Sequence, residues 1–185
     1  MNSKGRIVLG ITSSAAAYKG VALASLVRRT GYDVDGILTA NACRLVTPVQ
    51  LSCVTGRPVH TMQFAEQPGD PIPHITLSDG AAALVVAPAT ANFLGKLAAG
   101  IADDLLTTKA LACECRVLVA PSMNTRMWNH PAVRENVSKL SGRGVVFAGP
   151  VQGPLACGSS GAGRMMEPSD ILDILLSMLG RETGR

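Results

Sequence analysis

The sequence has few aromatic residues and few charges. Aromatic side chains make up 3% of the 185 residues and charged ones 16%, whereas apolar residues make up 47%. This composition excludes an intrinsically disordered chain. The 17 basic residues are scattered, so the net charge of +4 provides no patch for a nucleic acid, and no such partner is expected. The length predicts one domain over residues 1–180, followed by a frayed tail at 181–185.

A secretion signal and a membrane span are missing as well. The first residues, MNSKGRIVLG, lack an apolar segment before a cleavage site. The most apolar stretch, residues 81–102, contains Pro88, Asn92 and Lys96, and its uninterrupted apolar run is too short to cross a bilayer. We therefore expect a cytoplasmic protein with no membrane partner, and the low charge favours an oligomer.

The cysteines lack the spacing of a metal site. Cys113 and Cys115 are separated by one residue, and no histidine follows them at ligand spacing, so no metal is expected. An odd number of cysteines without a secretion signal favours a reducing compartment. Four of the five are expected to be small apolar residues, and the exception is Cys157.

Short β-branched runs alternate with helical patterns along the chain. Buried strands are predicted at 6–12, 32–39, 83–89, 116–122 and 144–150, and helices at 15–29, 91–100, 102–112, 131–140 and 168–179. Residues 42–54 are partly helical with a break at Pro48, 56–73 form a loop with short strand fragments, and 150–166 form a long glycine-rich loop. The alternation predicts an α/β fold, a doubly wound parallel sheet with helices on both faces.

Polar residues follow the ends of the predicted strands, where open α/β sheets bind ligands. Ser13 and Ser14 precede a helix, which suits a phosphate, although an ordinary helix cap is at least as good an interpretation of these residues alone. The first turn is not a G-x-G-x-x-G loop, and Thr39 stands where a dinucleotide-binding fold would place a carboxylate. These features favour a mononucleotide over NAD.

Two other features leave alternatives open, and a third has one interpretation. His74 precedes a buried strand and is either a structural residue or a catalyst. Asn124 lies between two methionines at a strand end, where an amide either orients a carboxylate or caps the next helix. The string GSSGAG is interpreted as a mobile flap, because it neither follows a strand directly nor opens a helix.

Together these motifs resemble the homo-oligomeric flavin-containing cysteine decarboxylases. That family includes phosphopantothenoylcysteine decarboxylase and the peptidyl-cysteine decarboxylases of ribosomal peptide biosynthesis. The resemblance extends from Gly10 to Ile171 and rests on GITSSAAAYKG, ILTANACRLVTP, PATANFLGKLAAGIADDLLTT, PSMNTRMW and LACGSSGAGRM, found in this order. It implies a single-domain flavodoxin-like fold, an FMN cofactor and an assembly of three or twelve copies.

The resemblance also implies a set of site residues. Those expected at the cofactor are Gly10, Thr12, Ser13, Ser14, Thr39, Ala87, Thr90 and Asn92. The expected catalytic residues are His74, acting on a flavin held by a neighbouring subunit, Asn124, holding the substrate carboxylate, and Cys157. Substrate contacts are expected from Met123, Asn124, Gly158, Gly161 and Arg164.

The implied chemistry is an oxidative decarboxylation. Hydride transfer from the substrate to FMN gives a thioaldehyde, whose C=S group lets carbon dioxide leave as an ene-thiolate forms. Cys157 favours phosphopantothenoylcysteine as the substrate, since it would protonate that ene-thiolate. The lack of a fused synthetase domain, and Ser78–Ala81 in place of the family's Arg-Trp-Ala-Asp, favour a peptide ending in cysteine. A flavin prenyltransferase, or a flavin-binding protein of this fold without decarboxylase activity, is the alternative.

Overall fold

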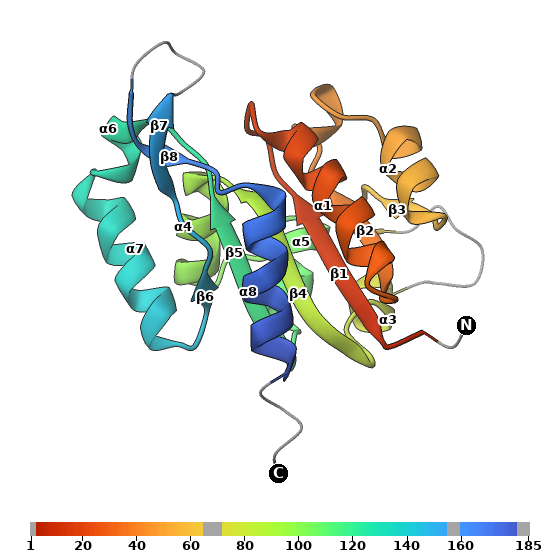
Figure 1. Cartoon of the computed structure of the whole chain (residues 1–185). Coiled ribbons are helices and arrows are strands. Elements are labelled where there is room, and N and C mark those ends of the chain that lie inside the picture. The colour runs from red at the N-terminus through yellow and green to blue at the C-terminus, as the bar shows by residue number, and fades with distance from the viewer. Residues whose placement is uncertain (1–2, 65–71, 155–159, 181–185) are drawn as a thin grey trace.

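A six-stranded parallel sheet forms the centre of the molecule (Figure 1). The computed structural model describes residues 3–64, 72–154 and 160–180. The strands lie in the order β3-β2-β1-β4-β5-β6, with all five pairs parallel. Their bounds are β1 Arg6–Ile11, β2 Asp33–Leu38, β3 Val59–His60, β4 Ala81–Ala89, β5 Arg116–Pro121 and β6 Val146–Phe147. The predicted doubly wound sheet is confirmed, and the strand order reverses direction between β1 and β4.

Helices cover both faces of this sheet. One face packs against α1 (Ala17–Arg29), α2 (Pro48–Thr55) and α8 (Pro168–Gly180). The other packs against α4 (Ala91–Ala99), α5 (Leu105–Leu111) and α7 (Pro131–Gly142). Short helices occur at η1 (Ala42–Arg44), α3 (Pro73–Thr76) and α6 (Thr125–Trp128). No helix within 3–64, 72–154 or 160–180 is both long and apolar enough to cross a bilayer.

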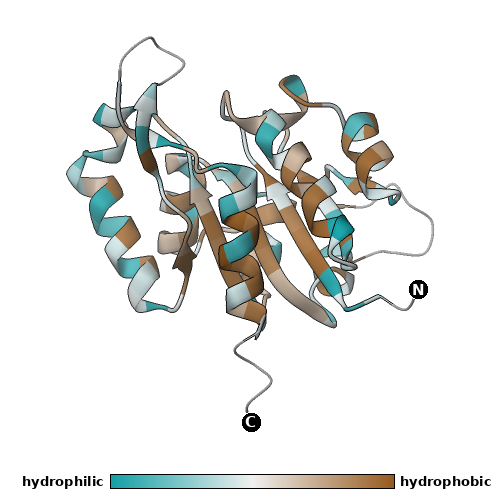
Figure 2. Cartoon of the chain, in the orientation of Figure 1, coloured by the Kyte–Doolittle hydropathy of each residue, from teal (hydrophilic) through white to brown (hydrophobic). Residues whose placement is uncertain are grey.

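Strand β1 shows why the central strands are continuous apolar runs. Ile7, Leu9 and Ile11 pack against the α1 and α8 side, whereas Val8 packs against the α4 and α5 side. Both faces of the strand are therefore buried, and period-two alternation with polar residues disappears. Figure 2 shows the consequence, since the central strands are largely brown whereas the surrounding helices alternate between brown and teal.

The predicted break at Pro48 separates two helical pieces, since η1 ends at Arg44 and α2 begins at Pro48 itself. A proline at the first helical position gives up no hydrogen bond. The hydroxyl of Thr47 caps the same helix by accepting from the backbone N–H of Gln50 at 3.0 Å.

The prediction of a long loop at 150–166 was wrong. In the part that the structure describes, β7 (Val151–Pro154) and β8 (Ser160–Arg164) pair as an antiparallel hairpin beside α6. The string GSSGAG was expected to form a mobile flap, but its residues from Ser160 onward belong to strand β8. Glycines replace β-branched residues in β8, and this hid the strand in the sequence. A Cβ atom on Gly161 would collide with the side chain of Thr125 in α6, and one on Gly163 with the backbone of Met123 just before α6.

Candidate active site

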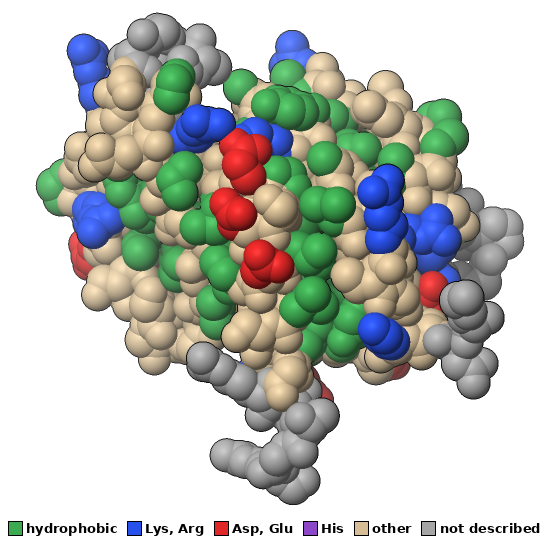
Figure 3. Space-filling view, in the orientation of Figure 1, with side chains coloured by type: hydrophobic (Ala, Val, Ile, Leu, Met, Phe, Trp, Pro, Cys, Tyr) green, Lys and Arg blue, Asp and Glu red, His purple; other side chains and the backbone are tan. Residues whose placement is uncertain are grey.

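A cavity of about 740 Å³ lies beyond the carboxyl ends of β1, β4 and β5. This is the crevice where the strand order reverses, the place where open α/β sheets bind ligands. In Figure 3 a notch separates the hairpin from the beginning of α1 at the same end of the molecule. The lining is formed by residues 13–16, 18–19, 90–92, 122–124, 127, 154 and 163–165.

One wall is the turn that leads into α1. Ser13 is exposed, and the hydroxyl of Ser14 lies 2.7 Å from the hydroxyl of Ser122 at the end of β5. Ser14 Oγ also accepts a hydrogen bond from the backbone N–H of Ala16 at 3.2 Å. Gly20 allows α1 to lie directly against β4, since a Cβ there would strike the carbonyl of Ala87. Small hydroxyl residues therefore lie beside a helix N-terminus, an arrangement suited to an anion.

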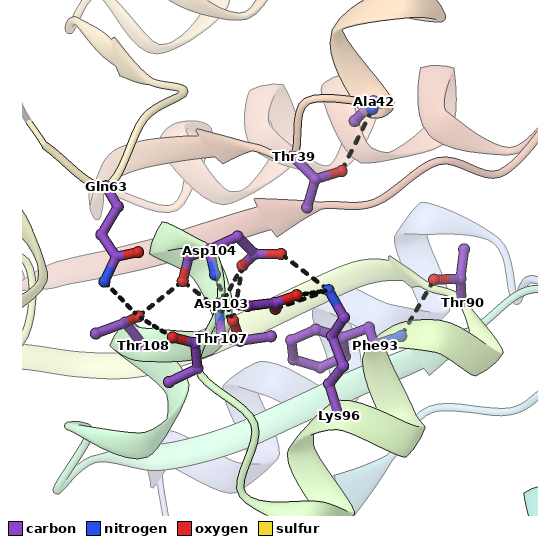
Figure 4. Close-up of polar contacts among 11 residues, drawn as sticks. Thr39, Ala42, Gln63, Thr90, Phe93, Lys96, Asp103, Asp104, Thr107 and Thr108 are labelled. Atoms are coloured by element: carbon purple, nitrogen blue, oxygen red, sulfur yellow. Dashed lines mark hydrogen bonds and ion pairs between the residues drawn. The ribbon is translucent and has the colours of Figure 1, made fainter.

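Thr12 lies below this wall and does not line the cavity. Its side chain donates to the carbonyl of Pro88 at 2.8 Å and accepts from the backbone N–H of Thr90 at 3.1 Å. The residue is only 3% exposed. Thr12 thus ties the end of β1 to the end of β4. Thr90 does line the cavity, and it caps α4 by accepting from the N–H of Phe93 (Figure 4).

We expect Thr12→Val to lower the free energy of unfolding of the cofactor-free protein by about 1–3 kcal/mol, because the partly buried N–H of Thr90 loses its acceptor. Chemical denaturation followed by circular dichroism measures this. Ser13→Ala is the control, since Ser13 is exposed and its substitution should change stability by less than about 0.5 kcal/mol. If Thr12→Val were as stable as the parent protein, Thr12 would not be needed to tie β1 to β4. Contact with the cofactor would then be the one role left for this residue.

Three other residues expected at the cofactor do not line the cavity. Thr39 accepts from the N–H of Ala42 at 3.3 Å (Figure 4), Gly10 is covered by Leu106, and Ala87 is fully buried. Gly10 and Ala87 lie near the carboxyl ends of β1 and β4, and Thr39 directly follows β2. Their contact with a cofactor stays a prediction. Ser13, Ser14, Thr90 and Asn92 are the expected residues that do line the cavity.

Asn124 lies on the opposite wall, together with Met123. It is the N-cap of α6, and its Oδ1 accepts from the backbone N–H of Arg126 at 2.8 Å. The sequence left open whether this amide caps a helix or faces a ligand. The structure shows the cap and also places the residue in the cavity lining, so the two interpretations do not exclude each other.

The hairpin rests directly on this wall. The backbone N–H of Met123 donates to the carbonyl of Gly163 at 3.0 Å. Gly163 and Arg164 line the cavity, whereas Gly161 packs against Thr125 outside it. Cys157 and Gly158, both expected in the site, lie outside the described residues.

Lys19 and Glu167, two charged residues beside the cavity, were missed from the sequence, whereas Arg164, which contacts the same carboxylate, was expected there. Lys19 is 8% exposed and lines the cavity with Arg164. Both side chains bind the same Glu167 oxygen, Lys19 Nζ at 2.7 Å and Arg164 at 2.6 Å. The hydrogen bond from Lys19 and the nearby Arg164 hold the pKa of Glu167 below its ordinary value. Figure 3 shows basic side chains next to the acidic ones where α8 begins. The only sequence signal was a lysine inside an apolar helical pattern.

His74 does not line the cavity of its own chain. It belongs to the short helix α3, which precedes β4 at the amino end of the sheet and packs against α5. Its Nδ1 is buried and has no hydrogen-bond partner among the described residues. The expectation that His74 acts on a neighbouring subunit's cofactor stays a prediction. The described residues contain no cluster of three His, Cys, Asp or Glu that could hold a metal ion.

Comparison with known proteins gives consistent matches. Residues 1–180 match the family model described as Flavoprotein. The coenzyme A biosynthesis bifunctional protein CoaBC of Bacillus subtilis is 43% identical over 178 residues, which is 96% of this chain and 44% of that protein. CoaBC of Mycobacterium tuberculosis is 40% identical over 176 residues, 95% of this chain and 42% of that protein. The chain thus spans less than half the length of these relatives.

Solved structures agree with this match. A mutant PPC decarboxylase complexed with pantothenoylaminoethenethiol superposes with a TM-score of 0.84 at 31% identity, covering 94% of this chain and 97% of that one. The FMN-dependent cysteine decarboxylase SpaF gives a TM-score of 0.83 at 31% identity and covers 97% of both chains.

Proposed function

Because this chain belongs to the Flavoprotein family, we propose that it is an FMN-dependent decarboxylase that removes carbon dioxide from the carboxyl group of a cysteine unit. The observation that carries the proposal is the cavity at the reversal of strand order. Its two walls present a helix N-terminus with serine hydroxyls on one side and Asn124 on the other. These walls match the two needs of the reaction, an anchor for a phosphate and an amide for a carboxylate.

The residues of this cavity fit FMN. Its volume of about 740 Å³ lies within the range of small-molecule sites, and alanine and methionine side chains offer apolar surface to a flavin ring. Ser13, Ser14 and the first turn of α1 would hold the phosphate, and Thr90 and Asn92 would lie near the ring. When bound, FMN supplies a hydride acceptor, the one function in this chemistry that amino-acid side chains lack.

The chain's own residues bind, orient and shield the substrate. The amide of Asn124 would donate to the substrate carboxylate from its NH₂ group while Oδ1 stays on the α6 cap. Strand β8 covers this wall and would exclude water from the leaving carboxyl group. Lys19 and Arg164 would attract anionic groups of the substrate, since Glu167 neutralises only one of the two charges. A histidine such as His74, contributed by a neighbouring copy, would move the proton.

The proposed substrate is phosphopantothenoylcysteine. CoaBC proteins, at 40–43% identity, support this choice, and the two cations beside the cavity suit a phosphorylated substrate. A peptide that ends in cysteine is the second candidate, supported by the full-length likeness to SpaF. The proposed assembly is a homo-oligomer of three or twelve copies.

The purified protein should be yellow and should turn over one of these two substrates. Incubation with phosphopantothenoylcysteine, and separately with a cysteine-ended peptide, is followed by mass spectrometry. A mass loss of about 44 Da corresponds to carbon dioxide alone and marks a saturated thiol, because the reduced flavin has returned its hydride to the product. A mass loss of about 46 Da marks an ene-thiol, because the flavin has kept the hydride. A colourless protein that cannot be reconstituted with FMN would contradict the proposed function.

A further inference from the structure

A pair of cysteines lies at the edge of the sheet opposite the cavity. Cys113 and Cys115 belong to the segment between α5 and β5, so they precede the strand whose far end forms the cavity wall. Their sulfur atoms are 2.6 Å apart and hydrogen-bonded, and both thiols are free. Both residues are partly buried and pack against the α4 and α5 side of the core. The proposed decarboxylation uses neither of them.

Lys109 makes this pair unusual. The residue lies on α5, is fully buried, and its Nζ has no hydrogen-bond partner among the described residues. An ammonium group removed from water without a partner is costly, so this lysine requires an anion nearby. The adjacent cysteine pair can provide one, because a thiol becomes negative when it loses its proton.

The charges around Cys113 favour its thiolate. The hydrogen bond from Cys115 and the positive charge of Lys109 lower the pKa of Cys113 to about 6. The same sulfur contact, together with burial, raises the pKa of Cys115. One of the two thiols is therefore ionised near neutral pH while its neighbour keeps the proton. This is the arrangement of an attacking thiol beside a resolving one.

A metal site explains the pair less well. The described residues contain no third His, Cys, Asp or Glu side chain placed with these two cysteines to complete a site. A buried lysine beside the sulfurs would also repel a cation. The cluster suits an electrophilic sulfur better than it suits a metal ion.

We propose that Cys113 and Cys115 form a redox-active dithiol that a small disulfide, such as glutathione disulfide, oxidises to an intramolecular disulfide. The Cys113 thiolate attacks one sulfur of the small disulfide, the S–S bond breaks, and one glutathione thiolate leaves. Cys115 then gives its proton to solvent and attacks the Cys113 sulfur, expelling the second glutathione. The protein loses two electrons and two protons, and the small disulfide gains them as two thiols.

Oxidation would remove the anion that Lys109 faces. The buried ammonium would then have no compensating charge between α5 and β5. The charge balance around Lys109 would therefore depend on the ratio of thiols to disulfides in the surrounding solution.

The first experiment treats the full chain with glutathione disulfide and follows its intact mass. We expect a loss of about 2 Da and a disulfide that peptide mapping locates between residues 113 and 115. Cys115→Ser should stop at a mixed disulfide on Cys113, about 305 Da heavier, since no resolving thiol remains. Cys53→Ser, which alters an exposed thiol, is the matched control and should behave as the parent does. A persistent glutathione adduct on the parent protein, or a disulfide formed by other cysteines, would overturn the proposal.

A second experiment begins with the parent protein, so its first measurement does not depend on the folding of a variant. The rate of Cys113 alkylation by iodoacetamide, measured against pH on the parent protein, should rise with a midpoint near pH 6. In Lys109→Met, checked for folding by circular dichroism, the midpoint should shift upward by about one pH unit or more, because the stabilising charge is gone. A midpoint near the ordinary value of a thiol in the parent protein would contradict the proposed site. Neither experiment requires FMN or substrate, so the result is independent of the proposed function.

Discussion

Asn124→Asp should lower kcat/KM for the cysteine substrate by at least about a hundredfold. Losing a hydrogen bond to a charged group costs roughly 1.5–3 kcal/mol, and the new carboxylate also repels the carboxylate of the substrate. The helix should not suffer, since aspartate caps a helix as well as asparagine does and keeps the bond to the N–H of Arg126. Steady-state kinetics with both candidate substrates measures the effect.

The variant Asn124→Ser separates the effect of the lost hydrogen bond from the effect of charge repulsion. Serine also caps helices, but it brings no negative charge, so its kcat/KM should lie between those of the parent and of Asn124→Asp. Thermal unfolding of all three proteins should agree within a few degrees, which shows that α6 is intact. If Asn124→Asp retained the parent's kcat/KM, the carboxylate would have to bind elsewhere in the cavity.

His74→Asn should abolish product formation while the protein keeps its flavin. A positioned general acid or base contributes about 10²–10⁴-fold to the rate, and asparagine cannot carry the proton. Flavin should remain bound because His74 does not line the cavity of its own chain. Product formation is measured by mass spectrometry, and flavin content by absorbance.

Co-expression of two inactive chains tests whether His74 serves a neighbouring copy. A mixed oligomer of His74→Asn and Asn124→Asp chains would contain some sites with an intact Asn124 from one chain and an intact His74 from the other. Activity should then reappear, whereas each variant alone stays inactive. Co-purified mixed oligomers without activity would show that both residues are needed in the same chain, and the proposed role of His74 would fail.

The sheet and the place of the cavity could be predicted from the sequence for a simple physical reason. Strands buried on both faces are continuous apolar runs, and the residues that follow them must gather at one edge. Ser14, Asn92 and Asn124 were found in this way. Thr12 was placed at the same edge, but only its bonds to the backbone near Pro88 and Thr90 reveal that it holds two strands together.

The remaining features depend on tertiary contacts that no local pattern records. The glycines of β8 have low strand propensity, and the strand forms because backbone can approach backbone there. Lys19 follows a helical pattern like any surface lysine, and its burial depends on Glu167, which lies 148 positions further along the chain. The break at Pro48 was predicted but the start of α2 there was not, because a proline that ends a helix and one that begins it have the same local signature.

The close fit of the hairpin against the wall of the cavity limits which positions of this protein can be redesigned. Gly161 and Gly163 have no room for a side chain, so libraries aimed at new substrates should leave both positions unchanged. Diversity is better introduced in the facing strand, where Gln152 and Pro154 are exposed and Pro154 borders the opening. Changes in substrate preference should therefore arise mainly through substitutions in β7, whereas β8 keeps its sequence because it packs tightly against the wall of the cavity.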